Sequence, residues 1–154
     1  MARTLSGILN LPMVETDSLV EQSAGRTIPE IFRELGEAAF RDLEFQALAG
    51  ALSHGVSVIA LGGGTLLRGD ALEMVTGCCR VFTLLAETQD LLARNNGGRP
   101  LAASESELRN LLDSRGEHYR GLPCPIDTSR KTPAEVAGEI AGILRREDPA
   151  RWSP

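Results

Sequence analysis

The strongest fold signal in this sequence is a nearly unbroken apolar run at residues 56–61, VSVIAL. Runs of this kind are typical of parallel strands that are covered on both faces by helices. Three glycines follow at once, at Gly62, Gly63 and Gly64, and a helical pattern begins near Leu66. A strand, a turn and a helix in that order indicate an α/β fold with a parallel sheet and right-handed crossovers.

The rest of the chain alternates in the same way, with no internal repeat in its sequence. Further short strands are predicted at residues 13–14, 79–84 and 125–127. The spacing of apolar residues predicts helices around residues 5–9, 19–25, 27–36, 37–53, 66–76, 91–94, 105–119 and 133–146. The 154 residues suffice for one core, so we predict a single domain at 1–146 and a C-terminal tail at 147–154.

Composition narrows the possible functions. The formal net charge is −5 and the pI about 5.1, which argues against a nucleic-acid-binding surface. No apolar run approaches the roughly 20 residues of a membrane-spanning helix, and the N-terminal segment lacks the pattern of a signal peptide. Three cysteines without metal-ligand spacing are predicted to be small buried residues of a reducing compartment: Cys78, Cys79 and Cys124. We therefore expect a cytoplasmic protein without nucleic-acid or membrane partners.

Two acidic residues follow the first predicted strand. Glu15 and Asp17 lie where ligands bind in open α/β sheets, outside the carboxyl ends of the strands. Acids at such a place can orient a hydroxyl or hold magnesium through water. The alternative is local, because Asp17 is also suited to cap a helix that begins at Ser18.

Arg41 stands next to Phe40 in a predicted helix. An arginine beside a buried aromatic ring can project into a cleft and bind a carboxylate through two parallel hydrogen bonds. The alternative is an exposed arginine that pairs with Glu37 or Glu44 along the helix.

The glycine triplet and a polar loop are the remaining candidates. Glycines let backbone amides approach a ligand closely, although neither G-x-G-x-x-G nor G-x-x-x-x-G-K-[ST] occurs in the sequence; a plain strand-to-helix turn is the alternative. Residues 95–103, NNGGRPLAA, are predicted to form a mobile loop, with Arg94 before it, Arg99 within it and Arg115 after it. Arginines on a closing lid can neutralise the charge that develops on a phosphoryl group during its transfer. The alternative is that these arginines are solvated surface residues.

Taken in order, these motifs resemble the shikimate kinase family from about Ala2 to Leu144. The segment LPMVETDSLVEQSAGRTIPEIFRELGEAAFRDLE is similar to the family's acceptor-binding region. ALGGG resembles its glycine triplet, RPL its lid, RGEHY the substrate arginine that follows, and IDTSRKTPAEVAGEI its adenine-side strand and last helix. The resemblance implies a three-layer α/β fold with a parallel sheet, of the P-loop nucleoside-monophosphate-kinase type.

The resemblance also implies roles for individual residues. Asp17 would hydrogen-bond the acceptor hydroxyls and assist deprotonation of the one that is phosphorylated. Arg41 and Arg115 would hold the shikimate carboxylate, with the glycine triplet in close backbone contact. Arg99 would reach the ATP phosphates from the lid as a catalytic residue. Arg94 and Lys131 would flank the adenine. Glu15 would help to hold magnesium through water.

The sequence departs from the family pattern at its start. Arg3-Thr4-Leu5-Ser6 matches the helix after the family's phosphate-binding loop. We therefore expect the first strand and the P-loop to be missing, because of a misplaced start codon, a fragment or a truncated, inactive relative. Loss of this central strand would expose the edges of its neighbours and lower stability. Two smaller departures are RPLA in place of RPLL and a glutamate, Glu15, in place of an aspartate.

The implied parent activity is transfer of the ATP γ-phosphoryl group to the shikimate 3-hydroxyl with Mg²⁺, a step toward chorismate and the aromatic amino acids. The implied partners are shikimate and ATP, and we expect a monomer. Two alternatives stay open: a non-catalytic shikimate-kinase-like ligand-sensing domain, and a related small-molecule kinase such as a gluconate kinase. Asp17, Arg41 and the glycine triplet together match shikimate better.

We predict that the 154-residue chain has no appreciable ATP-dependent kinase activity. A phosphate cradle with its lysine and metal supplies much of the charge stabilisation of phosphoryl transfer, and the sequence contains no such loop. A coupled assay of shikimate-dependent ADP release measures this. Adding an upstream strand with a G-x-x-x-x-G-K-[ST] segment should restore turnover. ADP release by the chain itself, near the rate of an intact homologue, would contradict the prediction.

Overall fold

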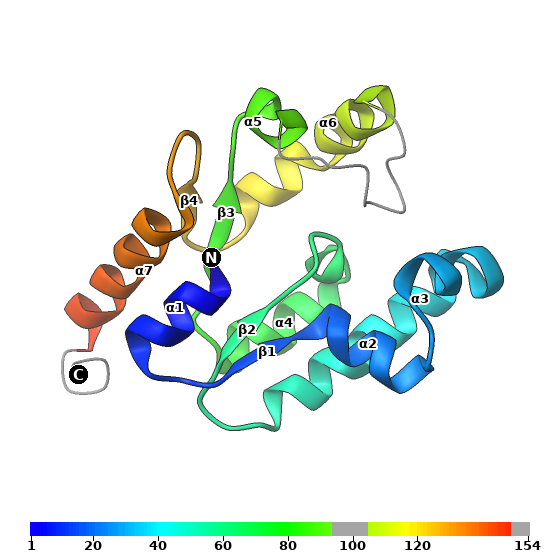
Figure 1. The fold of residues 1–154 in the computed structure, drawn as a ribbon, viewed down its shortest axis with the longest axis horizontal. Helices are drawn as coiled ribbons and strands as arrows, with labels where there is room; N and C mark the ends of the chain where they lie inside the picture. The colour runs from blue at the N-terminus through cyan, green and yellow to red at the C-terminus, as the bar shows by residue number, and fades with distance from the viewer. Residues whose placement is uncertain (94–104, 149–154) are drawn as a thin grey trace. The chain divides into compact units, whose positions relative to one another are not determined.

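The structure is a computed structural model that describes residues 1–93 and 105–148. Contacts divide the chain into two compact units, Met1–Met74 with Pro133–Pro154, and Val75–Thr132. Figure 1 traces the elements of both units from the N-terminus to the C-terminus. The domain boundaries that the sequence suggests, 1–146 and 147–154, stay a prediction.

Two short parallel strands lie at the centre of the first unit, β1 (Met13–Glu15) and β2 (Val58–Ala60). Their register pairs Met13 with Val58 and Glu15 with Ala60, so both strands end at the same edge. The segments that follow them, the start of one helix and the glycine triplet, therefore begin side by side. The other elements of this unit are α1 (Ala2–Leu9), α2 (Thr16–Ala24), α3 (Ile28–Leu52), the 3-10 turn η1 (Thr65–Leu67), the start of α4 (Gly69–Cys78) and α7 (Pro133–Glu147).

Local sequence signals explain how α2 leads into α3. α2 ends at Gly25, whose φ of 61° lies in the left-handed region that glycine tolerates best. Thr27 and Glu30 form the predicted capping box, in which the Thr27 N–H donates to Glu30 Oε2 at 2.8 Å. Gly36 is non-helical, with φ 81°, so α3 is kinked where the sequence predicts two helices. The two helices share a core of Val20, Ile31, Phe40 and Ala47.

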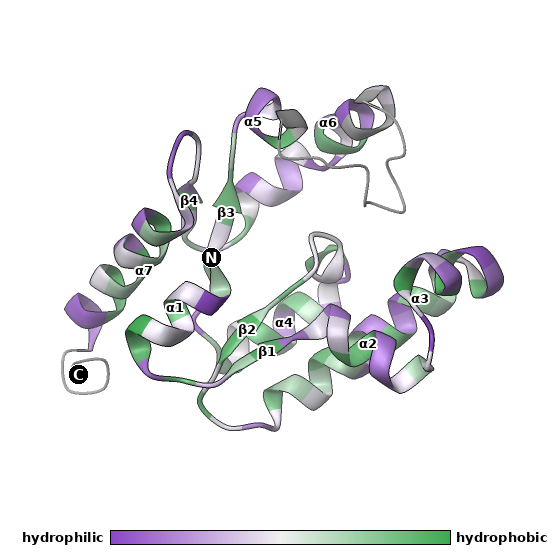
Figure 2. Cartoon of the chain, viewed as in Figure 1, coloured by the Kyte–Doolittle hydropathy of each residue, from purple (hydrophilic) through white to green (hydrophobic). Residues whose placement is uncertain are grey.

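α7 covers the unit with one apolar face and packs against α1. The buried residues of α7 recur at helical spacing: Val136, Ala137, Ile140, Ala141 and Leu144. Leu5 is the buried residue of α1. Figure 2 shows hydrophobic residues along β1 and β2 and alternating hydrophobic and hydrophilic stretches along α7.

The second unit contains the parallel strands β3 (Thr83–Leu85) and β4 (Pro125–Asp127), with α5 (Thr88–Ala93) and α6 (Glu105–Gly121). Directly after β4, the N–H and Oγ1 of Thr128 both donate to the Leu85 carbonyl, at 2.7 and 2.9 Å. This double contact extends the pairing of the strands by one residue. It also fixes the start of the loop that leads to α7.

The parallel pairing confirms the predicted α/β class, but the described strands form two separate two-stranded sheets instead of one. Each strand has a ladder partner on one side only within the described residues. Two-stranded sheets are marginal by themselves. The absence of a first strand and the loss of stability that would follow from it stay predictions.

Three expectations need correction. The strand predicted at 79–84 lies at Thr83–Leu85, because α4 continues to Cys78 and the Cys79 N–H still donates to Val75 O at 2.7 Å. The strand predicted at 56–61 is shortened to Val58–Ala60. The cysteines are free thiols but are not buried: Cys78 is exposed, and Cys79 and Cys124 are half-buried.

In the described part of the chain, no helix is both long and apolar enough to cross a membrane.

Candidate functional site

Asp17 lies in the first turn of α2, at the edge where β1 and β2 end. The fully buried Thr16 fastens this turn to β2, because its Oγ1 donates to the Ala60 carbonyl at 3.1 Å. The N-cap position is occupied by Glu15, so the alternative that Asp17 caps the helix is wrong. The Asp17 carboxyl group is therefore not needed for helix capping and can serve a ligand.

The surroundings of Asp17 favour its protonated form. Burial raises the pKa of this carboxyl group above its usual value, and the negative charges of Glu44, Glu15 and Glu21 raise it further. The positive charge of Arg41 acts in the opposite direction but is the smallest contribution. A raised pKa brings a carboxylate nearer to the strength of a general base that works near neutral pH.

Arg41 projects from α3 beside the buried Phe40, with its guanidinium carbon 5.1 Å from the ring centre. Its side chain is only 16% exposed. Nη1 donates to Glu44 Oε2 at 2.7 Å, while Nε and Nη2 both donate to Glu37 Oε1, at 3.3 and 3.0 Å. The predicted pairs with Glu37 and Glu44 are both present, but the alternative of an exposed arginine is wrong. Three of the five guanidinium N–H groups thus have acceptors within the described residues.

Glu44 is a site residue that the sequence suggested only as a helix-surface partner. Its side chain is 3% exposed, and each of its carboxylate oxygens has its own donor. Oε2 accepts from Arg41, and Oε1 accepts from the hydroxyl of Thr65 at 2.7 Å. A buried carboxylate needs such partners, because an unpaired charge away from water is costly. The sequence signal that could have identified Glu44 is its place three residues after Arg41, together with the polar Thr65 directly after the glycines.

The glycine triplet is shaped by these side chains. A Cβ on Gly62 would lie 2.9 Å from Glu44 Oε1 and 3.2 Å from Asp17 Oδ1. A Cβ on Gly64 would lie 2.7 Å from Cζ of Arg41 and closer still to Nη1. Neither glycine has the positive φ that would require glycine for conformational reasons. Space for Asp17, Arg41 and Glu44 is therefore the physical reason for glycine at 62 and 64.

The other predicted site residues lie elsewhere. Glu15 is exposed at the end of β1, where its Oε2 accepts from Ser18 Oγ at 3.3 Å. Arg115 is half-buried on α6, in the second unit. Arg94, Arg99 and the predicted lid at 95–103 lie outside the described residues.

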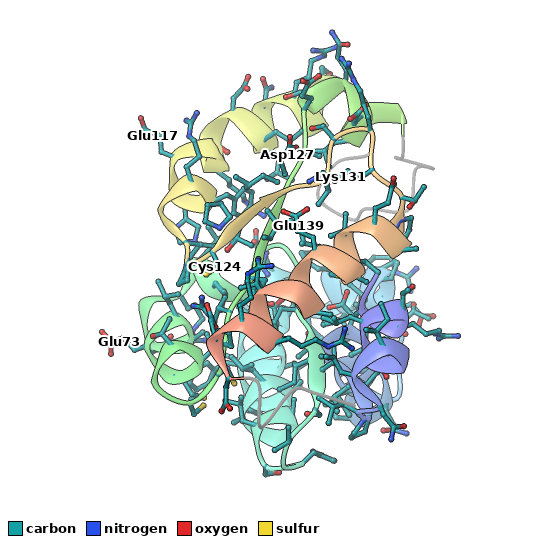
Figure 3. All side chains as sticks on the ribbon, turned by 90° about the vertical axis from the view of Figure 1, so that its left-hand side faces the viewer. Glu73, Glu117, Cys124, Asp127, Lys131 and Glu139 are labelled. Carbon is teal, nitrogen blue, oxygen red and sulfur yellow. The ribbon has the colours of Figure 1, made fainter. Side chains whose placement is uncertain are left out.

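Lys131 lies on the loop between β4 and α7, where Figure 3 labels it close to Asp127. Hydrogen bonds from Ser129 hold the pKa of the Asp127 carboxyl group below its usual value, and the charge of Lys131 lowers it further. The loop is tied to the segment after β3: the Glu87 N–H donates to Ser129 Oγ at 3.0 Å. The Arg130 N–H donates to Asp90 Oδ2 at 3.1 Å. The backbone around Lys131 is thus held by hydrogen bonds at several points.

The chain is similar to known proteins along nearly its whole length. A family model described as shikimate kinase matches residues 1–145. The shikimate kinase of Salinispora arenicola is 36% identical over 149 residues, which are 94% of this chain and 89% of that protein. That of Thermus thermophilus is 34% identical over 157 aligned residues, 98% of this chain and 85% of that protein.

Two solved structures are also similar. Shikimate kinase from Acinetobacter baumannii in complex with shikimate has a TM-score of 0.85 and 27% identity, with 96% of this chain and 86% of that chain covered. Shikimate kinase from Aquifex aeolicus has a TM-score of 0.79 and 30% identity, with 97% and 89% covered.

We predict that Asp17→Asn raises the melting temperature near neutral pH. Because the folded state raises the pKa of Asp17, the contribution of this group to stability is fully present below its unfolded pKa of about 4 and is lost as the pH rises through the folded value. The amide has no negative charge to bury, so it stabilises the fold at a pH where Asp17 is ionised. The gain in melting temperature should therefore shrink as the pH falls toward 4. Thermal unfolding followed by circular dichroism measures it, with the exposed Asp113→Asn as a control that leaves the melting temperature unchanged. A gain that grows at low pH would contradict the assignment.

We predict that Gly64→Ala destabilises the fold by about 1–3 kcal/mol, as overpacking does in well-packed regions. The added methyl group occupies the space of the Arg41 guanidinium and pushes it away from Glu44. The matched control is Gly50→Ala on the exposed side of α3, where an added Cβ meets nothing within 4 Å and should stabilise by roughly 0.5–1 kcal/mol. Urea unfolding compares the two, and equal free energies of unfolding for Gly64→Ala and wild type would refute the crowding.

Proposed function

Since the chain belongs to the shikimate kinase family, we propose that its first compact unit contains the shikimate-binding site for the family's reaction, transfer of the ATP γ-phosphoryl group to the 3-hydroxyl. The observation that carries this proposal is that Asp17, Arg41 and the glycine triplet lie together in one unit, around the buried carboxylate of Glu44. A carboxylate group and several hydroxyls are the chemical features of shikimate. An arginine and an aspartate side by side are suited to both.

In the proposed complex, the shikimate carboxylate binds the guanidinium of Arg41. The edge formed by Nε and Nη2 is the one that suits a bidentate carboxylate. In the structure this edge faces the single oxygen Oε1 of Glu37, whose side chain is 51% exposed. The ligand replaces this exposed contact, while the buried contact to Glu44 stays and keeps the guanidinium in place.

Asp17 is the proposed catalytic residue. Its carboxylate accepts a hydrogen bond from the acceptor hydroxyl and takes the proton as that oxygen attacks the γ-phosphorus. The bond from the phosphorus to the bridging oxygen breaks, and ADP leaves with the electron pair. The surroundings that raise the pKa of Asp17 support this role, because they make its carboxylate a stronger base.

The nucleotide side of the proposal rests on the family. Arg99 is proposed to contact the ATP phosphates, and Arg94 and Lys131 are proposed to flank the adenine. The hydrogen bonds that hold the loop of Lys131 support a fixed contact of this kind. On the acceptor side, Arg115 is proposed as a second arginine for the shikimate carboxylate, also by family resemblance.

Magnesium is proposed to accompany ATP, where it neutralises charge on the phosphates. Within the described residues there is no group of three or more potential metal ligands among His, Cys, Asp and Glu side chains. The exposed Glu15 is suited to one contact through a water molecule, as is usual for an ion held mainly by phosphates and water. We further propose a cytoplasmic monomer that acts in the biosynthesis of aromatic amino acids.

We predict that Arg41→Lys weakens shikimate binding to the chain about tenfold to a hundredfold, because a lysine cannot form the bidentate contact. Lysine is preferred to alanine here, since alanine would strand the buried Glu44 carboxylate at a cost of about 3–5 kcal/mol. Isothermal titration calorimetry gives the affinities. The control is Arg33→Lys on the same helix, whose side chain is 68% exposed and pairs with Glu34. Equal affinities of folded wild type and Arg41→Lys would remove Arg41 from the site.

A further inference from the structure

Thr65 has no role in the proposed reaction, although its hydroxyl contacts the buried Glu44. It begins the 3-10 turn after the glycine triplet and is 2% exposed. Its Oγ1 lies 2.7 Å from Glu44 Oε1 and 3.0 Å from the Gly62 carbonyl, and its N–H donates to the same carbonyl at 3.2 Å. A hydroxyl has a single proton to donate. The shorter distance and the charge of the acceptor assign this proton to Glu44.

The hydroxyl completes a chain of contacts that ends at the guanidinium. Thr65 holds one oxygen of Glu44, and the other oxygen holds Nη1 of Arg41. With both oxygens held, the Glu44 carboxylate cannot rotate about its terminal bond without losing a hydrogen bond. The orientation of the guanidinium therefore depends on a hydroxyl that lies 24 residues away in the sequence.

We propose that Thr65 is a positioning residue, which acts through Glu44 to aim the Arg41 guanidinium at the carboxylate of the acceptor. This inference rests on the proposed function, in which Arg41 binds that carboxylate. Thr65 itself does not need to touch the acceptor. Its backbone serves the same end, because the bond from its N–H to Gly62 closes the turn that leaves room for Arg41 beside Gly64.

A purely structural role for Thr65 predicts different results. If the hydroxyl of a buried threonine serves only the stability of the fold, the isosteric valine lowers that stability and leaves the ligand affinity unchanged. The chain offers a matched case: Thr128 is also buried, and its hydroxyl donates to the Leu85 carbonyl at 2.9 Å, in the second unit. Thr128→Val removes a buried hydroxyl without touching the Glu44–Arg41 pair.

The experiment compares Thr65→Val, Thr65→Ser and Thr128→Val with wild type in the 154-residue chain. Calorimetric titration gives the dissociation constant for shikimate, and the Nε–H signal of Arg41 in ¹H–¹⁵N NMR spectra without ligand reports the guanidinium. We expect Thr65→Val to weaken shikimate binding about tenfold, as loss of one charge-assisted hydrogen bond does, and to shift or broaden the Arg41 signal. Thr65→Ser keeps the hydroxyl and should restore both to within about twofold. Thr128→Val should lower the melting temperature only.

Unchanged shikimate affinity and an unchanged Arg41 signal in folded Thr65→Val overturn the inference, as does a loss of affinity that Thr65→Ser does not rescue. If Thr65→Val does not fold, Thr65→Ala takes its place with the same expectations. If the wild-type chain does not bind shikimate, the proposed binding site is wrong. The Arg41 signal then decides on its own whether Thr65 positions the guanidinium.

Discussion

The buried carboxylate of Glu44 governs the arrangement of the polar site. A carboxylate withdrawn from water must be matched by donors, because an unpaired buried charge costs several kcal/mol. Arg41 and Thr65 supply one donor each, both at 2.7 Å, and these contacts join α3 to the turn after β2. The same contacts bring oxygen and nitrogen atoms so close to Gly62 and Gly64 that a Cβ at either position would force them to move. One buried charge therefore accounts for an arginine, a hydroxyl and two glycines.

The strands determine where this cluster lies. Because β1 and β2 are parallel and end in register, the first turn of α2 and the glycine triplet emerge at the same edge. Thr16 then fixes the turn to β2 through the Ala60 carbonyl, which keeps Asp17 next to Gly62. Backbone pairing thus places the acid, and side-chain pairing places the guanidinium. Disturbing either would separate groups that the proposed reaction needs together.

The helix ends and one strand could be predicted from the sequence because they depend on neighbouring residues. The burial of Glu44 could not be predicted, because it depends on contacts between residues far apart in the sequence. The capping box at Thr27, the end of α2 at Gly25 and the strand before the glycines follow from local rules. The burial of Glu44 does not, because a glutamate three residues after an arginine is more often a solvated pair on a helix surface. Its burial depends on Thr65 and the turn after β2, which lie far from it in sequence. The displaced β3 has a local cause instead, since the helical hydrogen bond from the Cys79 N–H to Val75 O continues the end of α4 into residues with a strand-like pattern.

The charge balance around Asp17 has a consequence for an anionic substrate. Three carboxylates raise the pKa of Asp17, and the positive charge of Arg41 opposes them. If shikimate binds as proposed, its carboxylate takes the place of the Glu37 carboxylate on Arg41, so the guanidinium is paired with an anion in both states. The bound ligand displaces water from the acid, and this loss of solvation raises the pKa of Asp17 further. By linkage, acceptor binding and proton affinity at Asp17 increase together. The base therefore becomes strongest when the hydroxyl that it must deprotonate is in place.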